Sequence, residues 1–227
     1  MPVKKQSKGV CAYCEQEISK GGMSKHLAAC TERKKFTEES QTGKAASEML
    51  YHLRVQDAGP RLFWLDLEVR GQADLEDLDH YLRSIWLECC GHMSQFSFGR
   101  WIEDEISMKR KIAQVFQSGA ELRHIYDFGS STETSIKLVA TRKGAPTTSH
   151  PIALMARNKP PEAKCIECDE TAMWLCNECL IEDNRWGTLC DEHVEDHPHD
   201  EYGEPIQIVN SPRMGVCGYE GPAEPPY

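Results

Sequence analysis

Cysteine and histidine side chains occur in this chain in groups whose spacing is typical of metal sites. The first group, Cys11-x2-Cys14-x11-His26-x3-Cys30, lies near the N-terminus. A tight turn would present two thiolates on one side, and a short helix over 23–29 would place His26 and Cys30 one turn apart on one face. Four such ligands suit a tetrahedral structural zinc ion. The few apolar residues nearby form too small a core for independent folding, so we expect metal binding and folding to be coupled.

A larger group lies near the C-terminus. Its candidate ligands are Cys165, Cys168, Cys176, Cys179, Cys190, His193, His197 and His199. Eight ligands are the number that two tetrahedral zinc ions need. Two alternatives stay open: a single-ion ribbon held by the four cysteines of 165–179 with solvated histidines, and replacement of one histidine by Asp196 or Asp200.

Both groups resemble known zinc folds. The N-terminal spacing resembles C2HC zinc fingers, some of which bind nucleic acid and others protein. The C-terminal spacing resembles B-box and related cross-brace folds, in which ligand pairs one and three share one ion and pairs two and four share the other. That resemblance implies one site of Cys165, Cys168, Cys190 and His193 and another of Cys176, Cys179, His197 and His199. The expected cofactor is zinc, three structural ions in all, with no open position for catalytic water.

The net charge of the 227-residue chain, −10 at pH 7, is unevenly distributed. Residues 1–44 carry a net charge of +4, residues 45–145 carry −3 and residues 146–227 carry −11. The basic head has the sign to bind nucleic acid, and the acidic end favours a protein partner. An ordinary solvated surface explains the basic residues equally well. The candidate nucleic-acid contacts are Lys4, Lys5, Lys8, Lys20, Lys25, Arg33, Lys34 and Lys35.

The elements that must position these groups are predicted from hydropathy patterns. Alternation predicts strands over 50–55, 62–69 and 95–102, and a hairpin of 122–128 with 135–141. Asp74 is a suitable cap for a helix to about Leu87, and a shorter helix is predicted over 108–116. Because the strands come in pairs, we expect an α+β fold, a mixed or antiparallel sheet with helices on one face.

The middle of the chain resembles the plasmid pRiA4b ORF-3-like family, whose members are often labelled as TnpR-type passenger proteins of insertion sequences. The resemblance rests on FWLDLEV, DLDHYLRSIWLECCGHMSQFSF, HIYDFGSSTETSIKLV and VNSPRMGVCGY. It implies a compact α+β domain and no settled activity. The chain departs from the family pattern by having Ser94, Ser130, Thr132 and Thr134 at positions of a histidine, an aspartate, a tryptophan and a histidine. No nucleophile with an arginine cluster is present, so we do not expect a recombinase.

Some residues of the middle domain have reactive side chains. His92 and Asp127 keep the family pattern, although a lone histidine beside a strand is more often structural. Cys89 and Cys90 end a predicted amphipathic helix and are expected to be small core residues, with a reactive thiol as the alternative. Cys217 is expected to have no nearby partners.

These patterns predict three modules. We expect a C2HC finger with basic flanks (1–35), a linker (36–49), a pRiA4b ORF-3-like domain (50–145), a linker (146–163), a double-zinc module (164–203) and a tail (204–227). Neither a membrane-spanning run nor a secretory signal is evident, so we expect a cytoplasmic protein without a membrane partner. The expected function is non-catalytic recognition, of nucleic acid by the finger and of protein by the core and acidic module. The alternatives are a purely protein-binding assembly module and an enzyme using His92 and Asp127 or Cys89 and Cys90.

Overall fold

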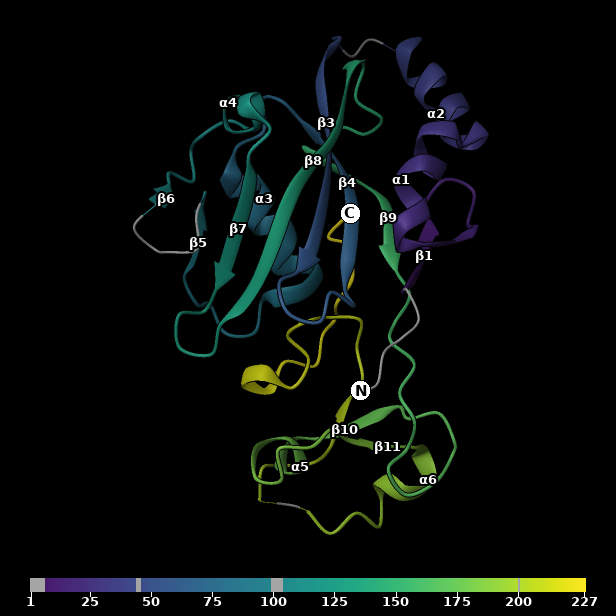
Figure 1. The fold of residues 1–227 in the computed structure, drawn as a ribbon, viewed down its shortest axis with the longest axis vertical. Helices are drawn as coiled ribbons and strands as arrows, with labels where there is room; N and C mark the ends of the chain where they lie inside the picture. Colours follow the sequence, from purple (N-terminus) through teal and green to yellow (C-terminus); the bar gives the residue numbers. More distant parts are fainter. Residues whose placement is uncertain (1–6, 44–45, 99–103, 200) are drawn as a thin grey trace.

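A nine-stranded antiparallel sheet lies at the centre of the molecule (Figure 1). The computed structural model describes residues 7–43, 46–98, 104–199 and 201–227. The strand order is β2-β1-β9-β4-β3-β8-β7-β5-β6, and every pairing within these residues is antiparallel. The strands are β1 Lys8–Cys11, β2 Glu17–Ser19, β3 Glu48–Asp57, β4 Trp64–Arg70, β5 Ser94–Ser97, β6 Glu105–Ile106, β7 Glu121–Tyr126, β8 Thr132–Gly144 and β9 Ile152–Asn158. The predicted α+β class is confirmed.

One face of the sheet packs on α3 (Leu75–Leu82), which continues through a π-helical turn, η1 (Arg83–Leu87). The Asp74 carboxylate accepts the backbone N–H of Asp77, so the helix begins where its cap was predicted. The predicted helix over 108–116 is shorter: it consists of α4 (Ile112–Val115) and a 3-10 turn, η3 (Phe116–Ser118). Of the predicted strand over 95–102, residues 99–102 lie outside the described residues.

The other face of the sheet is contacted by the N-terminal helices, α1 (Lys20–Ala29) and α2 (Thr31–Gln41); in Figure 1, α1 lies beside β1 and α2 continues above it. Trp64 is fully buried and packs with Met23 and Leu27 of α1 and with Met155 of β9. The finger therefore takes its apolar core from the sheet, which explains how so short a segment can pack.

The stretch expected as the linker 146–163 contains β9, which pairs with both β4 and β1. Ile152, Met155 and Ala156 are buried there. The segment is therefore an internal strand between the finger and the rest of the sheet, although proline, threonine and serine before it gave it the composition of a linker. Part of the predicted linker 36–49 belongs to α2 and β3.

A smaller sheet carries the C-terminal group of ligands, below the large sheet in Figure 1. Its order is β11-β10-β12, with β10 Trp174–Cys176, β11 Gly187–Leu189 and β12 Ile206–Gln207. Two short helices adjoin it, α5 (Asn177–Ile181) and α6 (Asp191–Val194). The tail, with a 3-10 turn η4 (Val216–Gly218), returns to the large sheet, where the Tyr227 ring stacks on His150 with centroids 3.9 Å apart.

Candidate metal centres

The N-terminal group converges as the sequence predicted. Cys11 ends β1, Cys14 follows in the turn, and α1 supplies His26 and leads to Cys30 at the start of α2. The four donor atoms lie within 4.8 Å of one another, with Cys14 Sγ 3.4 Å from His26 Nε2. Burial raises the pKa of Cys11 to about 11, so a thiolate at this position depends on a cation beside it.

Eight ligands of the C-terminal module fall into two groups. The first group is Cys165, Cys168, Cys190 and His193; the second is Cys176, Cys179, His197 and His199. This is the cross-brace pairing that the B-box resemblance implies. The four cysteines of 165–179 do not form one group, as a single-ion ribbon would need. Asp196 is exposed and belongs to neither group, and Asp200 lies outside the described residues.

The first of these groups is built by two turns that face each other. Cys168 Sγ lies 3.8 Å from Cys190 Sγ, and His193 Nδ1 lies 3.1 Å from Cys190 Sγ. His193 follows Cys190 by one helical turn on α6, which gives both side chains the same face. The backbone N–H of Glu167 donates to Cys165 Sγ at 3.4 Å, a contact that favours a thiolate.

The second group sits between β10, α5 and the segment after α6. Cys179 Sγ lies 3.3 Å from His197 Nε2 and 3.2 Å from His199 Nδ1. Burial, together with the neighbouring His199 ring, lowers the pKa of His197 and favours the neutral ring that coordinates a metal. A Cβ on Gly187 of β11 would overlap Cys179, so the strand approaches this group closely only because that residue is glycine.

These distances fit zinc. With Zn–S at about 2.3 Å and Zn–N at about 2.0–2.1 Å, tetrahedral geometry separates two sulfurs by about 3.8 Å and a sulfur and a nitrogen by about 3.5 Å. Three thiolates and one imidazole leave a net charge near −1 on each of two sites, and two of each leave the third neutral. Each set has four donors, so bound zinc would be structural.

The predicted nucleic-acid contacts differ in exposure and in pairing. Lys8, Lys25 and Lys34 are exposed, and Lys35 is exposed but paired with Glu32 at 2.9 Å. Lys4 and Lys5 lie outside the described residues.

Two of these basic side chains are engaged within the fold. Arg33 donates to the Glu68 carboxylate at 3.2 Å. Lys20 donates to the Arg61 carbonyl oxygen, and burial lowers its pKa to about 8, which reduces its positive charge near that pH.

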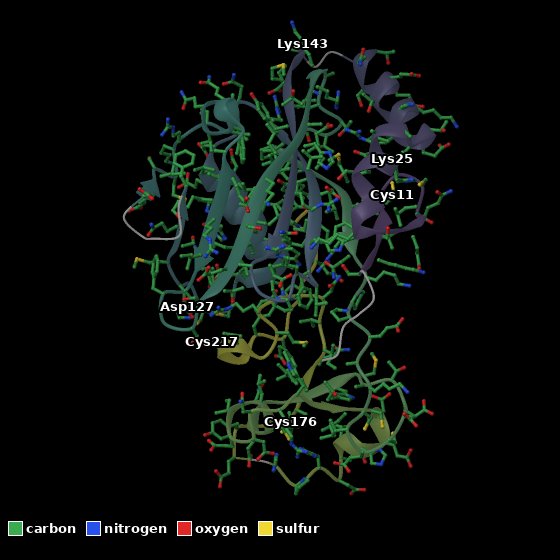
Figure 2. All side chains as sticks on the ribbon, viewed as in Figure 1. Cys11, Lys25, Asp127, Lys143, Cys176 and Cys217 are labelled. Atoms are coloured by element: carbon green, nitrogen blue, oxygen red, sulfur yellow. The ribbon has the colours of Figure 1, made fainter. Side chains whose placement is uncertain are left out.

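The reactive residues of the middle domain gather at one end of the large sheet. Asp127 lies 2.7 Å from Arg213 Nη2, and the guanidinium holds the pKa of this carboxyl at about 2. Cys90 is exposed, so the expectation of a core residue is wrong for it. The expectation that Cys217 has no partners is also wrong, because its Sγ lies 3.7 Å from Cys90 Sγ and 3.6 Å from His92 Nε2. Figure 2 shows Asp127 and Cys217 in this region, away from both Cys11 and Cys176.

Arg213 is the buried residue that sequence reasoning missed. It is fully buried, donates to the Ser130 carbonyl oxygen and Thr132 Oγ1, and lies over the Tyr126 ring at 4.8 Å. It lies within VNSPRMGVCGY, where nothing in the local sequence identified its partners.

A cleft separates the large sheet from the C-terminal module. Its volume is about 660 Å³. The lining comes from the turn after β3, from β11 and α5 of the module, and from the tail. The side chains include Leu62, Phe63, Leu180, Trp186, Val209 and Met214.

Comparisons with known proteins add only a weak structural similarity. No family model matches the chain, and no curated protein matches it. One similar solved structure is a protein of unknown function, MM3350, from Methanosarcina mazei Go1, with a TM-score of 0.39 and 20% identity over 46% of this chain and 66% of that chain. The pRiA4b ORF-3-like resemblance therefore stays a prediction. Among the described residues, no helix combines the length and apolar character needed to cross a membrane.

Proposed function

We propose that this chain is a zinc-stabilised, non-catalytic recognition protein whose ligand is a basic protein segment with an apolar anchor. The observation that carries the proposal is the cleft beside the acidic C-terminal module. Trp186 lines it and keeps 43% of its surface exposed, and large aromatic side chains of this kind are common energetic centres of protein interfaces.

The apolar lining supports an anchor side chain in the ligand. Leu62 and Phe63 come from the turn between β3 and β4, and Leu180 and Trp186 come from the module. Burial of one leucine-sized or aromatic side chain between such walls contributes about 1.5–3 kcal/mol. An apolar anchor therefore supplies affinity, and polar flanks must supply orientation.

Charge supports a basic ligand. Glu182 and Asp183 are exposed and precede Trp186 by only a few residues, and residues 146–227 have a net charge of −11. Such a surface attracts cationic segments and repels nucleic acid.

The zinc sites have a defined part in this function. Cys176 and Cys179 flank the start of α5, which carries Leu180, and Gly187 of β11 rests against Cys179. An ion bound there fixes the module wall of the cleft, so ligand binding should depend on zinc although no ligand atom contacts it.

Two observations support a non-catalytic role and a protein ligand. Asp127, the acidic group of the enzyme alternative, is paired with Arg213 and accepts the Gly129 backbone N–H at 2.9 Å. Arg33 and Lys20, two of the predicted nucleic-acid contacts, are used within the fold. The structure thus favours the protein-binding alternative over the nucleic-acid interpretation of the finger.

A peptide-display selection on the full zinc-loaded chain tests the proposal. We expect enriched peptides to carry an aromatic or branched apolar residue flanked by Lys or Arg. In fluorescence anisotropy, Trp186→Ala should weaken their binding by about 30-fold, the equivalent of about 2 kcal/mol. Ile181→Ala is the matched control, because Ile181, at the end of α5 in the same module, is 55% exposed but does not line the cleft.

Two outcomes would overturn this function. Selected peptides whose binding ignores both Trp186→Ala and added salt would place the ligand elsewhere. Binding of nucleic acid by the full chain, abolished by Lys25→Ala with Lys34→Ala and steeply salt-dependent, would instead establish the finger as the recognition surface.

A further inference from the structure

Four donor side chains outside the three predicted groups meet at the end of the large sheet. They are Cys89, Cys90 and His92, which follow η1, and Cys217 of the tail turn η4. We propose that these residues form a fourth tetrahedral site for zinc, which ties the C-terminal tail to the core. The inference is independent of the proposed ligand-binding function.

The spacing of the donors supports a tetrahedral ion. Cys89 Sγ and Cys90 Sγ are 3.5 Å apart, Cys90 Sγ and Cys217 Sγ are 3.7 Å apart, and Cys217 Sγ lies 3.6 Å from His92 Nε2. All four donor atoms lie within 4.8 Å of one another, as in the other three groups. These separations agree with the tetrahedral edges of about 3.5–3.8 Å that Zn–S and Zn–N bond lengths imply. Three thiolates and an imidazole are a donor set that zinc prefers.

The loop that carries three of the donors is held in place by its own contacts. The Tyr126 hydroxyl accepts the backbone N–H groups of Cys89 and His92 at 3.4 and 3.3 Å, and it donates to the Glu88 carboxylate at 3.1 Å. That carboxylate also accepts the Gly91 N–H at 2.6 Å. The donors are therefore oriented before any ion binds, which lowers the entropic cost of binding.

Arg213 supplies the charge that such a site needs. Zinc with three thiolates carries a net charge near −1, and Arg213 Nε donates to Cys89 Sγ at 3.3 Å. The same guanidinium pairs with Asp127, so this carboxylate, 3.5 Å from His92 Nε2, has a cationic partner of its own. Contacts of this kind stabilise ligating sulfur in metal sites.

Cys217 adopts an unusual backbone conformation. Its φ of 55° and ψ of 35° lie in the left-handed region, which is unfavourable for a residue with a Cβ. This conformation turns its sulfur toward Cys90, and a metal bond would offset the strain.

Exposure distinguishes this site from the other three. Cys90 and Cys217 are exposed, whereas Cys11, Cys176 and Cys179 are buried. A zinc ion here should exchange with solvent chelators faster than the others. The competing hypothesis is a disulfide between Cys90 and Cys217, whose sulfurs are close enough to bond after a small movement.

Native mass spectrometry of the zinc-loaded full chain tests the site by comparing the number of zinc ions that the wild type and its variants bind. Cys217→Ala and His92→Gln should each bind one zinc fewer than the wild type, whereas Met93→Ala, an exposed neighbour in the same loop, should bind the same number. A difference between variants does not depend on how many of the other three groups bind metal. In the wild type, a mild chelator should remove one zinc before any other.

A thiol count on the unreduced, denatured wild type separates the two hypotheses. We expect all eleven cysteines to react. Two fewer reactive thiols, with no zinc lost in Cys217→Ala, would establish the disulfide and overturn the site. If Cys217→Ala proves unfolded by circular dichroism, the wild-type chelation series decides: release of all zinc in one phase, with no early ion, would overturn it.

Discussion

At the scale of single residues, buried polar contacts on one face of the large sheet explain how the finger is attached to the sheet. Asp66 is fully buried, yet it accepts hydrogen bonds from Arg54 at 2.7 Å and from His52 at 2.6 Å. Arg54 also donates to Ser24 Oγ of α1 at 3.1 Å. A carboxylate can stay in such a place only because its partners compensate for the water it has lost.

Removal of this carboxylate should destabilise the protein strongly. In Asp66→Ala, Arg54 and His52 lose their carboxylate partner, and the free energy of unfolding should fall by about 3–5 kcal/mol. Urea denaturation measures the loss. Glu121→Ala is the control, because Glu121 pairs with Lys137 at 3.0 Å with both side chains half exposed, and such surface pairs contribute about 0–1 kcal/mol. Equal losses in the two variants would contradict the role assigned to Asp66.

The sequence predicted individual residues well where the signal was local. The twelve predicted ligands lie in the expected groups. Cys-x2-Cys turns and single helical turns bring neighbouring ligands together, whereas the pairing of the C-terminal segments was implied by the B-box resemblance. Cys217 was misinterpreted because its partners, Cys90 and His92, lie more than a hundred residues earlier in the chain. Arg213 escaped notice for the same reason, since Asp127 and Thr132 become its neighbours only in the fold.

At the scale of elements, short strands position the ligands. β1 brings Cys11 beside β9, and β11 brings Gly187 against Cys179. The sequence predicted β3 and β4 from alternation and α3 from its cap. It did not predict β9 as a strand of the sheet, because the pairing that makes it internal comes from β1 and β4, far away in the chain.

A single methyl group on β11 should disturb one zinc site and spare its neighbour. The Cβ of Gly187→Ala would overlap Cys179, so zinc at Cys176, Cys179, His197 and His199 should bind at least tenfold more weakly. Competition with a chromophoric chelator measures this affinity. The site of Cys165 and His193 is the internal control.

A second variant controls for the change of residue type. Gly59→Ala adds the same methyl group at an ordinary contact distance, 3.9 Å from the Asp57 carboxylate, and should leave every zinc affinity unchanged. Unchanged zinc binding in Gly187→Ala would show that the close approach of β11 is not needed.

At the scale of the whole molecule, a large sheet with its own apolar core supports two parts that carry the candidate metal groups. The core between α3 and the sheet contains Leu67, Leu78 and Trp86, all fully buried, and includes none of the twelve predicted ligands. One buried cluster of the C-terminal module consists of four candidate ligands, Cys165, Cys176, Cys179 and Cys190, together with Leu189. Stability should therefore be unequal along the chain.

Removal of metal should destabilise the two ends of the chain and leave the large sheet folded. With excess strong chelator, amide hydrogen exchange should become fast in 165–199 and in α1, whereas β3, β4 and β7 should keep their protection. Addition of zinc should restore the pattern, which controls for damage by the chelator. Loss of protection across the whole chain at once would show that the sheet also depends on metal, and no change would show that the ends do not.

Diffraction data collected on both sides of the zinc absorption edge would locate any zinc ion bound at the three predicted groups. The protein should be purified without added metal and without chelators, then crystallised as the full chain. We expect an anomalous peak at the centre of each predicted group, at Cys11 with His26, at Cys165 with His193 and at Cys176 with His199. Ordered side chains at these three places with no anomalous peak at any of them would contradict this expectation.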